Sequence, residues 1–186
     1  MLRKLGFLIA AALFVVPAFA AEIGGVKLDD KVTVAGQELV LNGAGIRTKA
    51  FFKIYVASLY VPQKAGDLAG VLAKGPRRIQ MNILRNLTPD QLVDALVEGL
   101  NENNPPAEMA AVKAQTDQLV SIMKAFKEVK EKDVVALDFV DGGTRVSFNG
   151  EARGTIPGEP FNKALTRIWL GDKPIQSDLK KALLGS

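Results

Sequence analysis

The chain has 186 residues, 48% of them hydrophobic, and a formal net charge of +4 in which adjacent basic residues occur only as pairs. Such a balance lacks the concentrated basic surface of nucleic-acid binding proteins, so we expect no nucleic-acid partner. The sequence has no histidine and no cysteine, which excludes disulfides, histidine-based catalytic triads and imidazole or thiolate metal sites; we expect neither a metal nor a cofactor.

Residues 1–20 have the pattern of a secretory signal peptide. Arg3 and Lys4 precede an apolar run from Leu5 to Val16, and small residues flank Phe19 before the expected cleavage after Ala20. The run is shorter than the roughly 20 apolar residues of a membrane span, so we expect no transmembrane segment in the mature chain. We predict a periplasmic protein, with secretion as the alternative, and one domain over residues 21–186.

The first part of the mature chain is rich in strand signals. Alternating apolar residues over 26–41 predict a small antiparallel hairpin, and the glycines of 42–45 predict a turn or bulge that leads into a strand over 51–61. Alternation in this strand places Lys53 and Tyr55 on one face and Tyr60 on the other. Because both faces are largely apolar, we expect a central strand that is covered on both sides.

The middle of the chain predicts a short helix over 67–73, a strand over 78–84 and then two longer helices. Thr88 as N-cap, followed by Pro89 and by Gln91, has the pattern of a capping box. Asn103-Asn104-Pro105 ends this helix, and apolar spacing predicts the next over about 106–128.

The last third predicts a meander and two helices. The strands cover 134–140, 144–148 and 151–156, with Asp-Gly and Asn-Gly sequences at the turns. A helix runs from Pro160 to Trp169 and is closed by Gly171, and Ser177 caps a final one. The order of elements predicts an α+β fold in which helices are layered on an antiparallel sheet.

Four ordered blocks carry a resemblance to a known family: LNGAGIRTKAFFKIYVASLYV, RRIQMNILRNLTPDQL, VSFNGEARGTIPGEPFNKAL and RIWLGDKPIQSDLKKALLG. With these blocks the chain resembles the bacterial secreted branch of the chalcone isomerase-like family. The resemblance implies an open-faced β-sandwich, an antiparallel sheet layered with helices, with a ligand cleft between the sheet and the helices.

The resemblance also implies that Arg47 and Tyr55 line this cleft. Plant chalcone isomerases carry threonine where Tyr55 stands, whereas the related plant fatty-acid-binding proteins use an arginine and a tyrosine to hold a carboxylate. Leu92 stands where chalcone isomerases have a catalytic tyrosine. We therefore expect no catalytic residues and no flavonoid cyclisation.

Physical chemistry supports an anion clamp, since a guanidinium offers a fixed fork of donors and a phenol adds another. The alternative is that Arg47 pairs with a surface acid while Tyr55 fills the core. Lys53 either supports the same anion or extends into solvent. Arg85 either faces the mouth of the cleft or pairs with Asp90.

Other aromatic residues are assigned to the core. Tyr60 lies on the strand face opposite Tyr55, which favours a role in core packing. Trp169 with Phe161 and Leu165 indicates contact between a helix and the sheet rather than a ligand cage.

The leading hypothesis is a periplasmic, non-catalytic binding protein for a small apolar carboxylate such as a fatty acid, gripped by Arg47 and Tyr55. One alternative is an isomerase or intramolecular lyase that stabilises an enolate-like oxyanion. Another is a cell-envelope interaction protein whose cleft is vestigial.

Overall fold

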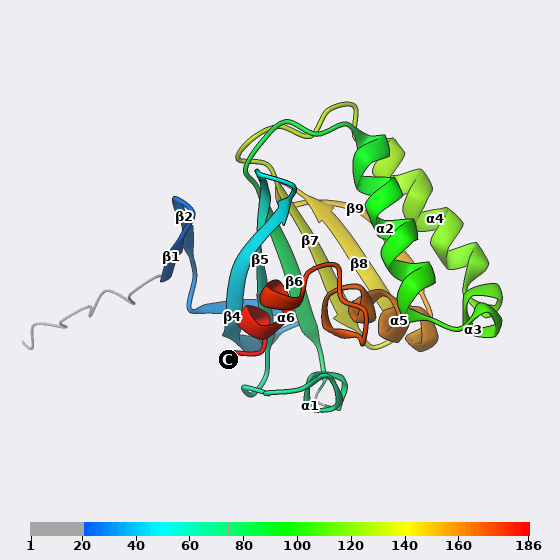
Figure 1. The fold of residues 1–186 in the computed structure, drawn as a ribbon. Helices are drawn as coiled ribbons and strands as arrows, with labels where there is room; N and C mark the ends of the chain where they lie inside the picture. Colours follow the sequence, from blue (N-terminus) through cyan, green and yellow to red (C-terminus); the bar gives the residue numbers. More distant parts are fainter. Residues whose placement is uncertain (1–20, 74) are drawn as a thin grey trace, which may run out of the picture.

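The computed structural model describes residues 21–73 and 75–186, so the expected signal peptide lies outside the described residues. The described chain has an α+β fold in which helices pack on a curled, seven-stranded antiparallel sheet (Figure 1). The strand order follows the sequence from β3 to β9, and a separate two-stranded hairpin precedes it. The fold class expected from the sequence is thereby confirmed.

The separate hairpin consists of β1 (Ala21–Ile23) and β2 (Val26–Leu28). The main sheet contains β3 (Lys31–Val34), β4 (Gln37–Lys49), β5 (Phe52–Val61), β6 (Arg77–Ile83), β7 (Val134–Val140), β8 (Gly143–Phe148) and β9 (Glu151–Pro157). The helices are α1 (Leu68–Leu72), α2 (Pro89–Asn103), α3 (Pro106–Ala111), α4 (Lys113–Lys124), α5 (Glu159–Leu170) and α6 (Ser177–Leu183). No helix among these described residues combines the length and apolar character needed to cross a bilayer.

Capping and turn sequences explain where several elements begin. Thr88 and Gln91 form the predicted capping box at the start of α2: the Thr88 hydroxyl accepts from the Gln91 N–H at 3.2 Å, and the Gln91 side chain accepts from the Thr88 N–H at 3.0 Å. The meander β7–β8–β9 matches its predicted bounds to within one residue. These elements depend on signals that lie within a few residues of one another.

Two helix predictions are wrong. The single helix expected over 106–128 divides at Val112, whose backbone (φ −109°, ψ 15°) leaves the helical region, and α4 ends at Lys124. Ser177 is the first residue of α6 and not its cap. Gln176 holds the cap position without a side-chain cap bond, because its amide is bonded to β4 instead.

The helices α2, α4 and α5 lie over one face of the sheet, and the main core fills the space between (Figure 1). Phe161, Leu165 and Trp169 belong to this core, as predicted. Tyr60 is fully buried on the other face, where it packs in a smaller cluster with Val34, Leu39 and Val140. Strand β5 is therefore central and buried on both faces.

The glycine-rich segment lies within β4 and forms a bulge there, since the pairing register with β5 shifts between Leu41 and Gly43. A Cβ at Gly43 would lie 2.1 Å from the Ala182 carbonyl oxygen, and one at Gly45 would lie 2.8 Å from the Ala182 Cβ. The missing side chains thus allow α6 to pack directly on the backbone of β4. The Asn42 side-chain amide stabilises the same contact, because it donates a hydrogen bond to the Leu183 carbonyl at 2.7 Å.

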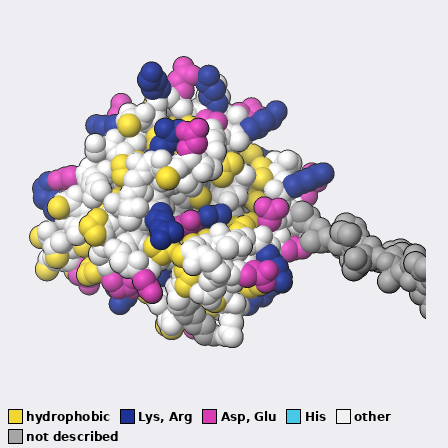
Figure 2. Space-filling model, turned by 180° about the vertical axis from the view of Figure 1, so that it is seen from behind, with side chains coloured by type: hydrophobic (Ala, Val, Ile, Leu, Met, Phe, Trp, Pro, Cys, Tyr) yellow, Lys and Arg dark blue, Asp and Glu magenta, His cyan; other side chains and the backbone are white. Residues whose placement is uncertain are grey.

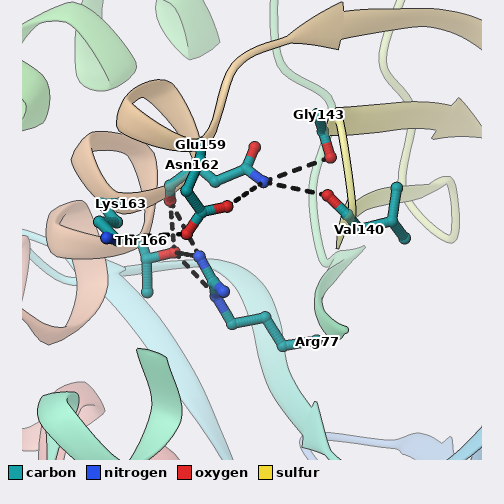
Figure 3. Close-up of polar contacts among 7 residues, drawn as sticks. All are labelled: Arg77, Val140, Gly143, Glu159, Asn162, Lys163 and Thr166. Atoms are coloured by element: carbon teal, nitrogen blue, oxygen red, sulfur yellow. Dashed lines mark hydrogen bonds and ion pairs between the residues drawn. The ribbon is translucent and has the colours of Figure 1, made fainter. Parts of the chain in front are cut away.

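A buried polar cluster joins α5 to the sheet (Figure 3). Arg77 is 3% exposed, lies 4.5 Å from the centre of the Phe139 ring, and donates to the Thr166 hydroxyl (2.9 and 3.1 Å) and the Asn162 carbonyl (3.1 Å). The Asn162 amide donates to two carbonyls at the β7–β8 turn. Burial lowers the pKa of Arg77 to about 10, partly offset by the charge of Glu159. The cluster fixes α5, and with it Trp169, above the sheet.

We expect Gly43→Ala to destabilise the fold by about 1–3 kcal/mol, because the added methyl group must displace α6 from β4. Urea unfolding of residues 21–186 measures the change. Gly66→Ala is the matched control, since a Cβ there meets nothing within 4 Å and should leave stability nearly unchanged. Equal stability of the two variants would contradict the close contact between α6 and β4.

Candidate functional site

Two adjoining cavities lie between α2 and the sheet. The outer cavity has a volume of about 370 Å³ and is lined by Arg47, Lys49, Ala50, Phe52, Ile54, Tyr55, Arg85, Asn86, Leu87, Gln91, Leu92, Ala95 and Ile175. The inner one has a volume of about 50 Å³ and is lined by Tyr55, Met81, Ile83, Leu92, Ala95, Leu96, Leu119, Met123, Val135, Leu137, Val146, Ile168, Trp169 and Ile175.

The two cavities meet at Tyr55, Leu92, Ala95 and Ile175, which line both. The outer cavity contains three basic side chains, and none of its lining residues is acidic. The inner cavity is apolar except for the Tyr55 hydroxyl, the Trp169 indole nitrogen and the two methionine sulfurs. The site therefore changes from cationic to apolar along its depth, which suits a ligand that is anionic at one end only.

Arg47 stands directly opposite Tyr55 in the pairing of β4 with β5, so the resemblance and the structure bring these two residues together. The half-buried Arg47 guanidinium donates to the Thr48 carbonyl and, at 3.3 Å, to the Gln176 side-chain oxygen. Within residues 21–73 and 75–186, it forms no ion pair with an acid. Its charge is therefore held by neutral acceptors and remains available to an anion.

Tyr55 is 5% exposed, and its hydroxyl accepts a hydrogen bond from the Trp169 indole nitrogen at 3.2 Å. An indole N–H can only donate, so the Tyr55 oxygen is the acceptor of this bond and its own proton remains free to donate. Burial raises the pKa of Tyr55, opposed by the bond from Trp169 and by the charge of Arg47. The phenol is accordingly a protonated donor at neutral pH.

Arg85 is one of the residues that line the outer cavity, and its guanidinium carbon lies 4.2 Å from the centre of the Phe52 ring. Arg85 forms no ion pair with Asp90, whose carboxylate lies 3.8 Å from the Lys124 ammonium nitrogen. Arg85 and Arg47 thus line the same cavity.

Lys53 is exposed and lies outside the lining of both cavities. The predicted alternation is wrong at this end of β5 because of a bulge: Arg47 pairs with Tyr55 but Thr48 pairs with Lys53, which leaves Ile54 as an extra residue. Ile54 consequently lines the outer cavity next to Tyr55.

Sequence reasoning missed the contribution of the α5–α6 connection. Ile175 closes one wall of both cavities, and Gln176 accepts from the Thr48 N–H at 2.8 Å. Nothing in the local sequence marks Gln176. Trp169 carried a usable signal, because a buried indole N–H needs an acceptor and the chain has only two tyrosines that could supply a phenol.

Comparison with curated protein sequences finds no match. Among solved structures, the chain is similar to the crystal structure of an Arabidopsis thaliana fatty-acid binding protein, with 11% sequence identity and a TM-score of 0.67. The alignment covers 86% of this chain and 92% of the plant protein, and at this identity it shows a shared fold. The sequence profile described as "Chalcone isomerase-like" matches residues 20–185. This match spans nearly the whole chain, which therefore belongs to the chalcone isomerase-like family.

Proposed function

We propose that the protein is a non-catalytic periplasmic binding protein for a fatty acid or a similar apolar carboxylate. The observation that carries the proposal is the pairing of Arg47, which has no acidic partner among the described residues, with the buried, protonated Tyr55 at the junction of the two cavities. The signal-peptide pattern of residues 1–20 supports export.

The carboxylate would accept hydrogen bonds from the Arg47 guanidinium and the Tyr55 hydroxyl. Hydrogen bonds to charged groups are stronger than neutral ones, and the partial exclusion of water at this depth strengthens them further. Arg85 adds positive charge at the mouth. The fatty-acid binding activity named for the Arabidopsis protein of the same fold fits this arrangement.

The hydrocarbon chain would enter the inner cavity. At about 50 Å³ this cavity is smaller than engineered apolar cavities of about 150 Å³ that admit benzene, so a long chain requires side chains to move. Met81 and Met123 line the cavity, and methionine is unbranched and adapts its shape readily. We therefore expect α2 and the methionine side chains to shift when the ligand enters.

Leu92 favours binding over catalysis. It lines both cavities at the position where the resemblance to chalcone isomerases places a catalytic tyrosine. An aliphatic side chain can neither donate nor accept a proton, so general acid or base chemistry at this point is unavailable.

We expect Arg47→Ala to weaken the binding of hexadecanoate by about 2 kcal/mol or more, roughly thirtyfold, because it removes a charged hydrogen bond to the carboxylate. Calorimetric titration of delipidated residues 21–186 measures the affinity. Arg145→Ala, at an exposed position on β8, is the matched control and should bind normally.

In the same titration, Tyr55→Phe should weaken hexadecanoate binding by about 1 kcal/mol, less than Arg47→Ala does, because the lost hydrogen bond has a neutral donor. Tyr60→Phe is its control, since Tyr60 is buried on the opposite face of β5. The clamp would be refuted by unchanged hexadecanoate affinity in both site variants. Hexadecanol, which lacks the carboxylate, should bind equally well with and without Arg47.

We expect Ala95→Leu to shift the preferred ligand toward shorter chains. Ala95 lines both cavities, so the added methyl groups narrow the passage between them while leaving the head-group site open. Competition among saturated fatty acids of increasing length measures this preference. Ala114→Leu, at an exposed position of α4, should not alter it; an unchanged length preference in Ala95→Leu would place the hydrocarbon chain elsewhere.

We also expect the folded protein to resist tyrosine ionisation at pH 10. The chain has two tyrosines, and burial raises the pKa of both above the ordinary value. The folded state therefore keeps protons that the unfolded state loses, and the free energy of unfolding should fall as the pH rises above about 10. Tyrosinate absorbance should be weak at this pH in buffer and appear in denaturant. An ionisation midpoint near pH 10 for either tyrosine in the folded protein would contradict the burial of its phenol.

A further inference from the structure

Two aromatic side chains project from the tip of the β4–β5 hairpin. Phe51 is 99% exposed and Phe52 is 58% exposed, and they are the large hydrophobic residues that stand out in this way within the described chain. They follow Ala50, whose backbone adopts a left-handed conformation (φ 53°) that turns the chain at the tip. Single exposed apolar residues are common on protein surfaces, but two adjacent phenylalanines at the end of a hairpin form a protruding apolar point.

Basic residues surround this point. Lys49 and Lys53 are exposed and flank the turn, while Arg85 stacks on the Phe52 ring at 4.2 Å. Across residues 21–73 and 75–186, none of these three cations pairs with an acid. The tip is therefore aromatic at its end and positively charged around its base.

Two ion pairs lie among the other charges at the same end of the molecule. The Lys130 and Glu128 side chains approach to 2.8 Å in the α4–β7 connection, and those of Arg153 and Glu151 approach to 2.8 Å on β9. Figure 2 shows Lys, Arg, Asp and Glu side chains mingled around the upper part of the molecule. Lys49, Lys53 and Arg85 thus lie beside the two phenylalanines without an acidic partner among the described residues.

We propose that the β4–β5 tip docks on the surface of an anionic phospholipid bilayer, with Phe51 and Phe52 in the headgroup region and Lys49, Lys53 and Arg85 facing the lipid phosphates. Phenylalanine is among the residues that insert at the boundary between headgroups and acyl chains, and each basic residue near an anionic leaflet adds electrostatic attraction. A stable protein interface buries about 800 Å² on each partner, far more than a hairpin tip offers. A bilayer accepts a projecting point of this size.

Docking in this way would place the mouth of the outer cavity against the bilayer, because Lys49, Phe52 and Arg85 line it. An apolar ligand could then pass between membrane and cavity without crossing bulk water. This consequence rests on the proposed binding function, whereas the docking itself does not and is measurable without any ligand.

Flotation of residues 21–186 with vesicles of phosphatidylglycerol and phosphatidylcholine tests the proposal, with pure phosphatidylcholine vesicles for comparison. Phe51→Ser should weaken partitioning about tenfold, because it removes a large apolar side chain from the interface. Lys53→Glu should weaken it about tenfold or more, because it reverses one charge. Lys64→Glu is the charge-matched control at the opposite end of β5 and should have little effect.

A Phe51→Trp variant reports insertion directly. Its fluorescence should be quenched by brominated lipids in the anionic vesicles. The unmodified chain carries one tryptophan, Trp169, which is 3% exposed and should not be quenched.

Absence of binding to anionic vesicles at low salt would overturn the proposal, as would equal weakening by Lys53→Glu and Lys64→Glu. Conversion of a dimer to a monomer by Phe51→Ser, without a change in vesicle binding, would overturn it in favour of a second copy of the chain. Phe51 and Lys53 line neither cavity, so their variants should bind hexadecanoate normally in vesicle-free solution, whereas Arg47→Ala should weaken that binding and keep its docking.

Discussion

The direct packing of α6 on the backbone of β4 is the constraint on which the candidate site depends. Gly43 and Gly45 leave space that any side chain would fill, so the helix lies against the strand. This contact brings the α5–α6 connection close to the end of β4. There Gln176 accepts a hydrogen bond from Thr48, and Ile175 lines both cavities. The glycines therefore shape the pocket from a distance, and they do so by packing and not by touching a ligand.

How much the sequence predicts depends on how local the relevant signal is. The capping box of α2 and the β7–β8–β9 meander were predicted because their determinants lie within a few residues. The division between α3 and α4 was missed because apolar spacing continues across Val112 while the backbone does not. The bulge at Ile54 was missed because it reflects the pairing of β5 with β4, which alternation along one strand does not reveal.

The candidate site combines both kinds of information. Residue types alone left Arg47 and Tyr55 open to a purely structural role, and the family resemblance placed them in a cleft. The structure then supplies what neither source contained: the Tyr55 oxygen accepts from Trp169, which orients the phenol, and Arg47 finds only neutral partners among the described residues. The polar cluster around Arg77 (Figure 3) stabilises this arrangement, because it holds α5, the helix that carries Trp169, against the sheet.

The extra residue in β5 separates two structural roles within one hairpin. On the sheet side of Ile54, pairing ties Tyr55 to Arg47; on the other side, residues 49–53 form the projecting tip. Insertions or deletions confined to the tip can therefore change what the molecule touches without disturbing the pair beneath. Relatives should accordingly be aligned here by strand pairing, because counting residues from the glycines would exchange inward and outward positions whenever the hairpins differ by an odd number of residues.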